Sequence, residues 1–148
     1  TAGSVHDRLS VMGARLAVDT LARLTAIEPT PQNHDAHTLA PLIDRAMARI
    51  DWSSDARAIH NMVRGFNPWP SAWTTLGGER LKVHETRLAD GTGKAGSVIE
   101  AGKRLCVATG QGAVELVSIQ LPGKRAQSGL DVVNGGRIAA GAMLGEET

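Results

Sequence analysis

Residues 98–121 have the sequence Val-Ile-Glu-Ala-Gly-Lys-Arg-Leu-Cys-Val-Ala-Thr-Gly-Gln-Gly-Ala-Val-Glu-Leu-Val-Ser-Ile-Gln-Leu, and this stretch decides the fold class. Apolar runs occur at Val98-Ile99, Leu105–Val107 and Val114–Leu121, with glycine-containing turns between them. Short runs rich in β-branched residues and bounded by glycine are typical of strands. The stretch therefore predicts three strands joined by short turns.

A further strand is predicted just upstream, from an alternating pattern. One face would carry Leu81, Val83 and Glu85, and the other Lys82, His84 and Thr86. Turn signals also occur at Gly77-Gly78, Asp90-Gly91 and Pro122-Gly123. Several short strands at such spacing predict a small closed or partly open β-barrel.

The N-terminal third of the chain is predicted to be helical and then extended. Residues 4–24 have apolar side chains at helical spacing, with Ser4 and Asp7 forming a capping pattern at the start. The stripe comprises Val5, Leu9, Met12, Leu16 and Leu24. Residues 28–41 are predicted to be a linker, because Pro29 and Pro31 near its start disfavour helix and inner strand.

Three short helical segments are expected around the barrel. A helical turn is predicted within residues 42–47, and a helix capped by Ser53 would bury Ile59, Val63 and Phe66. A last helical turn is predicted at residues 130–134. The fold class is therefore α+β, with an N-terminal amphipathic helix and linker before a barrel with short flanking helices.

Composition limits the class of protein. The chain has 148 residues, 42% of them hydrophobic, which is ordinary for a globular domain. No apolar run is long enough to cross a bilayer, and the single Cys106 fits a reducing, cytoplasmic setting. Residues 80–125 hold eight basic against four acidic side chains, a mild indication of a polyanionic partner.

Other motifs carry little chemistry. The pattern Gly91-Thr-Gly93-Lys-Ala-Gly96 matches a dinucleotide fingerprint, but a strand rather than a helix is predicted after it, so we expect a hairpin loop. His34 and His37 lack the further ligands that a metal site needs. No nucleophile motif surrounds any serine, so the sequence predicts no complete active site.

The three tryptophans fall in one informative stretch. Trp52 precedes the predicted second helix, and the proline-stiffened corner of residues 64–73 carries Trp69 and Trp73. Large indoles usually bury extensive apolar area, so we expect all three to form the main core cluster of the barrel. A functional alternative is that the rigid corner fixes Arg64 and nearby backbone against a ligand.

The same stretch resembles the opening of the C-terminal domain of methionyl-tRNA formyltransferases. The resemblance rests on the order and spacing of several pieces along nearly the whole chain. They are Thr1–Leu9, Pro31-Gln32, Ile50-Asp51-Trp52, Arg64-Gly65-Phe66-Asn67-Pro68-Trp69-Pro70, Leu81-Lys82-Val83, Thr109-Gly110-Gln111-Gly112, Ile119–Arg125 and Asp131–Gly135. The chain starts at Thr1 and almost at once with a helix, so we interpret it as a piece of a longer protein.

The resemblance implies three parts and a function. Residues 1–27 would be the last helix of the family's catalytic domain, residues 28–41 the linker, and residues 42–148 an OB-like tRNA-binding domain. Members of the family transfer a formyl group from 10-formyltetrahydrofolate to methionyl-initiator tRNA. Because the family's catalytic Asn, His and Asp and its folate site belong to the preceding domain, this chain is expected to hold no catalytic residue, cofactor or metal.

The expected partners are initiator tRNA and the catalytic domain, without a membrane. The candidate contacts to tRNA phosphates are Arg45, Arg49, Arg64, Lys82, Lys103, Arg104, Lys124 and Arg125. Two alternatives remain open. One is a sister enzyme that acts on a nucleotide sugar or on formyltetrahydrofolate, and the other is a free-standing oligonucleotide-binding barrel. A free-standing barrel should bury the stripe of the first helix, whereas a severed domain should leave it exposed.

Overall fold

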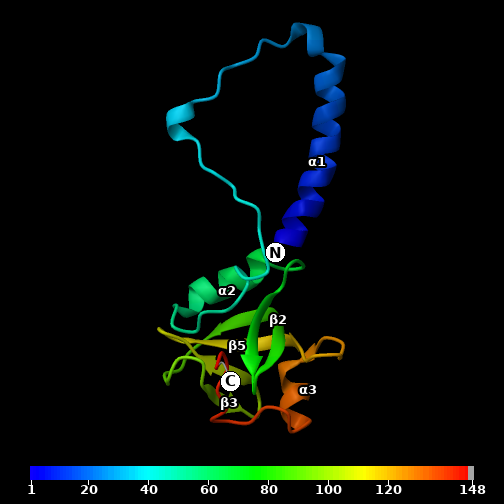
Figure 1. Cartoon of the computed structure of the whole chain (residues 1–148). Helices are drawn as coiled ribbons and strands as arrows, with labels where there is room; N and C mark the ends of the chain where they lie inside the picture. The colour runs from blue at the N-terminus through cyan, green and yellow to red at the C-terminus, as the bar shows by residue number, and fades with distance from the viewer. Residues whose placement is uncertain (147–148) are drawn as a thin grey trace.

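Helix α1 (Ala2–Ala22) projects away from the rest of the chain in the computed structural model, which describes residues 1–146 (Figure 1). Its first turn contacts the remainder of the molecule, where the Gly3 amide donates to the Asn67 carbonyl at 3.0 Å. The helix begins two residues earlier than predicted, and Thr1 rather than Ser4 is its N-cap. Ser4 instead completes a capping box with Thr1, because it occupies the third helical position.

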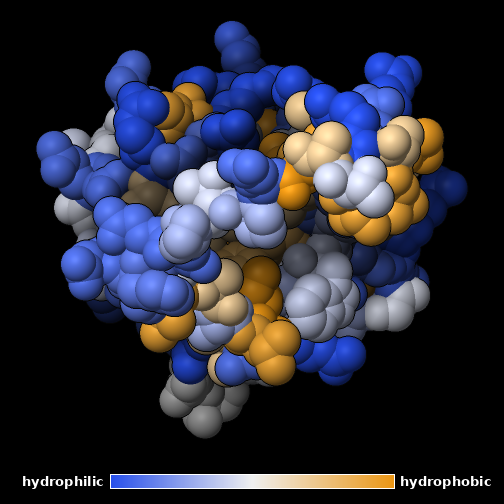
Figure 2. Space-filling view, turned by 90° about the horizontal axis from the view of Figure 1, so that it is seen from above, coloured by the Kyte–Doolittle hydropathy of each residue, from blue (hydrophilic) through white to orange (hydrophobic). Residues whose placement is uncertain are grey.

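The apolar stripe of α1 is exposed. No residue of the helix is buried, and Val5 and Leu16 keep 53% and 64% of their surface. Viewed from the end at which α1 projects, hydrophobic groups lie at the surface among hydrophilic ones (Figure 2). The amphipathic helix predicted from sequence is therefore present, but within residues 1–146 nothing covers its stripe.

The chain between α1 and α2 is largely extended. It contains two isolated 3₁₀ turns: η1 (Leu24–Ala26) precedes the predicted linker, and η2 (His34–Ala36) lies within it. Residues 21–47 are all exposed. The helical turn predicted within residues 42–47 is wrong, since only a bend and turn form there. The Asp44 carboxylate accepts from the amides of Ala46 and Met47, at 2.6 and 3.0 Å, and this local bonding competes with helix formation.

Helix α2 (Ala56–Gly65) lies against the sheet and buries Ala56, Ile59 and Val63. Asp55, not Ser53 as predicted, is its N-cap, with the carboxylate accepting from the Ala58 amide at 2.9 Å. The predicted burial of Ile59 and Val63 is confirmed, whereas Phe66 follows the helix as its C-cap and is only half-buried.

Six antiparallel strands form one sheet in the order β1-β2-β5-β4-β3, with β6 pairing β5. Their bounds are β1 Ala72–Leu76, β2 Glu79–Ala89, β3 Val98–Ala101, β4 Leu105–Ala108, β5 Ala113–Gln120 and β6 Gln127–Ser128. Helix α3 (Gly129–Asn134) follows, as the sequence predicted. The strands predicted at residues 81–86, 98–99, 105–107 and 114–121 are thus confirmed.

The sheet does not close through a strand ladder between β1 and β3 in the part of the chain that is described. Instead, a C-terminal segment of residues 141–146 lies across both edges. Leu144 forms a bridge with Leu76 on β1, and Met143 forms one with Ser97 beside β3. Of the two predicted forms, the partly open one describes the sheet.

Strand β2 carries a bulge that the alternating pattern did not predict. The register with β5 shifts on both sides of Glu85, and beyond it Thr86 is buried whereas Glu85 is exposed. The predicted grouping of Glu85 with Leu81 and Val83 is therefore wrong, because an extra residue reverses the face of everything after it. The hydroxyl of Thr86 then meets His60 Nδ1 at 2.9 Å.

The predicted cluster of three indoles is also wrong. Trp52 is buried in the core, and its Nε1 donates to the Thr74 hydroxyl at 2.9 Å. Trp73 is only half-buried, and Trp69 keeps 58% of its surface exposed. Aliphatic side chains from α2 and the strands, among them Ile59, fill the core instead.

Within residues 1–146, no helix is both long and apolar enough to span a bilayer.

Candidate nucleic-acid interface

Trp73 on β1 organises a surface where several of the predicted cations meet. The segment before α2 runs beside this strand, with the Ile50 amide donating to the Trp73 carbonyl at 2.8 Å and the Trp73 amide to the Ala48 carbonyl at 2.9 Å. The indole Nε1 donates to the Arg45 carbonyl at 2.9 Å. These bonds hold Arg45 and Arg49 next to the outer face of the sheet.

Two guanidinium groups lie over the Trp73 ring. Arg80 lies 4.0 Å from the ring centroid and Arg49 lies 5.8 Å from it, both within cation–π range. Lys82 is the register partner of Trp73 across the β1–β2 ladder. Arg80 and Lys82 are two residues apart on a strand, so both point to the same face.

These residues line a hollow of about 220 Å³, here called the Trp73 hollow. Its lining consists of Arg45, Trp69, Pro70, Ser71, Trp73, Arg80 and Lys82. A second hollow of about 240 Å³ shares Arg80 and Lys82 with it and continues to the turn at residues 121–123. No acidic residue lines either hollow, so the paired hollows form a continuous cationic surface.

A chain of hydrogen bonds fixes the turn that carries Lys124. The Gln120 side-chain amide donates to the Lys124 carbonyl at 2.8 Å, which leaves its Oε1 to accept. His84 Nε2 lies 3.0 Å from that oxygen, so this nitrogen must carry the proton. The His84 carbonyl accepts from the Asn67 side chain at 2.7 Å. The turn is thereby tied to β2 and to the proline corner.

The other predicted cations lie apart from this surface. Lys103 and Arg104 lie in the β3–β4 turn, at the sheet edge opposite β1. The Arg104 guanidinium is 2.8 Å from the Glu100 carboxylate, and its hydrogen bond lowers the pKa of that carboxyl. Arg125 lines a hollow near β6 and α3.

Arg64 belongs to a separate hollow between α2 and β2. His60 and His84 also line it. Burial, followed by the nearby positive charge of Arg64, lowers the pKa of His60 and favours its neutral form. The predicted set therefore divides. Arg45, Arg49 and Lys82 lie beside Trp73, and Lys124 directly follows the turn that lines the second hollow. The remaining four, Arg64, Lys103, Arg104 and Arg125, lie elsewhere.

The predicted site residues lack Arg80 and the two indoles of the Trp73 hollow, Trp69 and Trp73. The period of a strand places Arg80 on the face of Lys82, so the alternation around residue 82 could have identified it. Trp69 was assigned to the core because indoles usually bury most of their area. Nothing in the local pattern distinguished it from Trp52.

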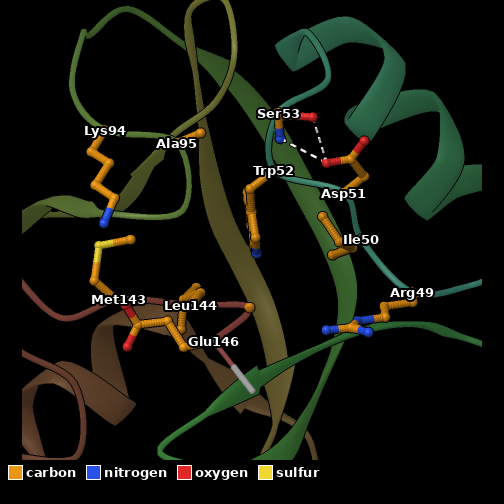
Figure 3. A pocket seen from close by; sticks show the side chains of 11 residues that line it. Arg49, Ile50, Asp51, Trp52, Ser53, Lys94, Ala95, Met143, Leu144 and Glu146 are labelled. Carbon is orange, nitrogen blue, oxygen red and sulfur yellow. Dashed lines mark hydrogen bonds between the residues drawn. The ribbon is translucent and has the colours of Figure 1, made fainter. Parts of the chain in front are cut away.

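A further hollow, of about 520 Å³, is lined by Arg49 and by residues of the 50–53, 94–95 and 143–146 segments, and it offers little chemistry (Figure 3). Lys94 and Glu146 flank apolar walls that include Trp52 and Leu144 (Figure 3). Asp51 bonds to Ser53, and the Ser53 hydroxyl lowers the pKa of this carboxyl. No group of three His, Cys, Asp or Glu side chains that could hold a metal occurs within residues 1–146.

The glycine-rich loop beside this hollow is not the predicted hairpin. It joins β2 to β3, which are not neighbours in the sheet. A Cβ at Gly91 would lie 2.3 Å from the Ile99 side chain, and one at Gly96 would lie 2.5 Å from the Leu144 carbonyl oxygen. The glycines therefore let the connection between β2 and β3 pack closely against its neighbours. The next element is strand β3, not the helix that would hold a pyrophosphate.

Comparison with known proteins identifies the domain type. Residues 42–137 match the family described as formyl transferase, C-terminal domain. The chain belongs to this family. As a formyl transferase C-terminal domain, it contains the sheet, α2 and α3 within the matched residues.

Relatives extend the likeness beyond the matched residues. The chain is 44% identical over 97% of its length to the methionyl-tRNA formyltransferase of Jannaschia sp. (strain CCS1), and equally so to that of Ruegeria pomeroyi (strain ATCC 700808 / DSM 15171 / DSS-3). It is 40% identical to the methionyl-tRNA formyltransferase of Streptococcus equi subsp. equi (strain 4047). It covers 47% of the first two proteins and 48% of the third, so it spans about half the length of these curated relatives.

Solved structures share the fold at lower identity. A crystal structure of a HypX variant from Aquifex aeolicus matches 94% of this chain and 24% of its own, with a TM-score of 0.65 and 19% identity. HypX from the same organism in complex with tetrahydrofolic acid matches 79% of this chain and 21% of its own, with a TM-score of 0.60 and 21% identity. These likenesses support the fold assignment alone.

Proposed function

We propose that this chain is the C-terminal, tRNA-binding part of a methionyl-tRNA formyltransferase. The whole enzyme would transfer a formyl group from 10-formyltetrahydrofolate to the amino group of methionyl-initiator tRNA in the cytoplasm. The observation that carries the tRNA-binding role is the cationic surface around the Trp73 hollow, on a chain whose relatives have methionyl-tRNA formyltransferase as their name.

The surface would bind through phosphates. Arg45, Arg80 and Lys82 line the Trp73 hollow without an acidic neighbour, and Lys124 directly follows the turn that lines the second hollow. Each phosphate that a cation neutralises releases counterions, which gives affinity with little reading of sequence. Arg104 is a weaker candidate because its guanidinium already pairs with Glu100.

The chemistry would occur elsewhere in the whole enzyme. The Thr86 hydroxyl that meets His60 is on a buried residue, and binding of the formyl donor would belong to a preceding catalytic domain. The exposed stripe of α1 supports a neighbour of this kind, since a stripe of this periodicity normally packs on a core. It also disfavours the alternative of a free-standing barrel.

The test measures initiator-tRNA binding by the full-length protein over a range of salt concentrations. Lys82→Ala and Lys124→Ala should each lower the log–log salt slope by about 0.7–0.9, the value for one phosphate contact. Arg87→Ala is the matched control, because Arg87 lies on the same strand beyond the bulge and opposite Glu115. Slopes unchanged in both lysine variants would remove this surface from the proposal.

A further inference from the structure

Trp69 is displayed at the surface by a corner of the chain that is held on several sides. The Ser71 amide donates to the Phe66 carbonyl at 2.9 Å, and the Ser71 hydroxyl donates to the Pro68 carbonyl at 2.8 Å. The neighbouring Asn67 side chain anchors the corner to β2. Trp69 is thus a large aromatic surface that is exposed and yet held in place, an unusual combination for a side chain with so much apolar area.

The surroundings of Trp69 combine aromatic and cationic groups. The Trp73 hollow has Trp69 and Trp73 in its wall, and Arg80 lies over the Trp73 ring. Arg45 and Lys82 add two further positive charges. A phosphate alone would be satisfied by the cations and would leave the indole face unused, and an apolar partner would leave three cations desolvated without counter-charge.

We propose that the Trp73 hollow binds one unpaired nucleotide of an RNA, with its base against Trp69 and its phosphate among Arg45, Arg80 and Lys82. This inference rests on the proposed tRNA-binding function and adds a base site to a surface otherwise described by charge. Single-stranded nucleotides are recognised by stacking on aromatic rings or on arginine planes, with cations along the backbone. The hollow holds both kinds of group within one lining.

The experiment compares three ligands of the full-length protein: initiator tRNA, a short oligoadenylate, and an abasic sugar–phosphate oligomer with the same number of phosphates. Trp69→Ala should weaken oligoadenylate binding roughly 5- to 150-fold, the range for losing one base–aromatic stack. Binding of the abasic oligomer and the salt slope for tRNA should stay unchanged, because Trp69 carries no charge. Trp69→Phe should restore most of the lost affinity.

A second variant keeps the charge and changes only the shape of the cation. Arg80→Lys should weaken oligoadenylate and the abasic oligomer to a similar extent, because the phosphate that Arg80 binds is present in both ligands and lysine lacks the planar guanidinium fork. Arg87→Lys, on the same strand but outside the hollow, is its control and should change neither. Urea unfolding confirms that each variant is folded, which the exposure of Trp69 leads us to expect.

The outcomes separate the two proposals. If Trp69→Ala leaves oligoadenylate binding unchanged, or weakens oligoadenylate and abasic oligomer equally, the base site is overturned. The tRNA-binding function survives that result as long as Lys82→Ala still lowers the salt slope. If the wild-type protein does not bind tRNA, the proposed function fails, and the base site fails with it.

Discussion

Helices α1 and α2 are both amphipathic by sequence, but they differ in what covers their apolar faces. In α2, Ile59 and Val63 are inaccessible to solvent and pack against the sheet. In α1, Leu9 and Leu16 face solvent along more than half of their surface. The contrast shows that hydrophobic periodicity predicts a helix and its apolar face. It does not predict whether the surface that covers this face lies in the same piece of chain.

The largest change in the free energy of unfolding is expected for a substitution on the buried face of α2. Ile59→Ala should lower the free energy of unfolding by about 2–5 kcal/mol, through lost burial and the cavity left behind. Urea unfolding followed by circular dichroism measures this change. A loss comparable to that of a surface substitution would mean that α2 is not part of the core and would erase the contrast with α1.

A smaller change in the free energy of unfolding is expected for a substitution at the N-cap of α2. Asp55→Ala should lower the free energy of unfolding by roughly 0.5–2 kcal/mol, because the Ala58 amide loses its acceptor. Asp55→Asn retains an acceptor oxygen and should lose less. The same urea experiment applied to Ser53→Ala tests the assignment, since a greater loss there than for Asp55→Ala would make Ser53 the cap.

The smallest effect is expected on the stripe of α1. Leu16→Ala in the 148-residue chain should change the free energy of unfolding by no more than about 0.5 kcal/mol, because the side chain is exposed and alanine favours helix. Equilibrium urea unfolding, with sedimentation to monitor self-association, checks this. A loss of several kcal/mol would show that the stripe is covered in solution, for example by a second copy of the chain.

Much of the fold followed from local patterns. Local patterns predicted the strands at 98–99, 105–107 and 114–121 and the burial of Ile59 and Val63 on α2. The spacing of apolar residues reflects which side chains are buried, and glycines mark the turns between strands. The bulge at Glu85 was not predictable, since an extra residue leaves no mark in the alternation before it. The hairpin predicted at Gly91–Gly96 is instead a connection between non-neighbouring strands, because strand order is set by long-range pairing, which no local pattern encodes.

The candidate interface was predictable only in part. Basic residues between 80 and 125 indicated a polyanion, but sequence could not separate Lys82, which lies beside Trp73, from Arg104, which pairs with Glu100 at the opposite edge. Trp69 was misassigned because burial of an indole is the common outcome and depends on tertiary packing. The grouping of arginines around Trp73 becomes visible only once strand register is known.

Residues 141–146 lie across both edges of the sheet, and this has a consequence for self-association. The amides of Leu144 and Gly145 donate to the carbonyls of Gly96 and Thr75, at 2.9 Å each, and so occupy hydrogen-bonding groups along both margins. Unpaired margins of this kind are templates on which further chains can add as strands. Any change that detaches residues 141–146 would therefore expose both edges of the sheet at once and favour aggregation by strand addition.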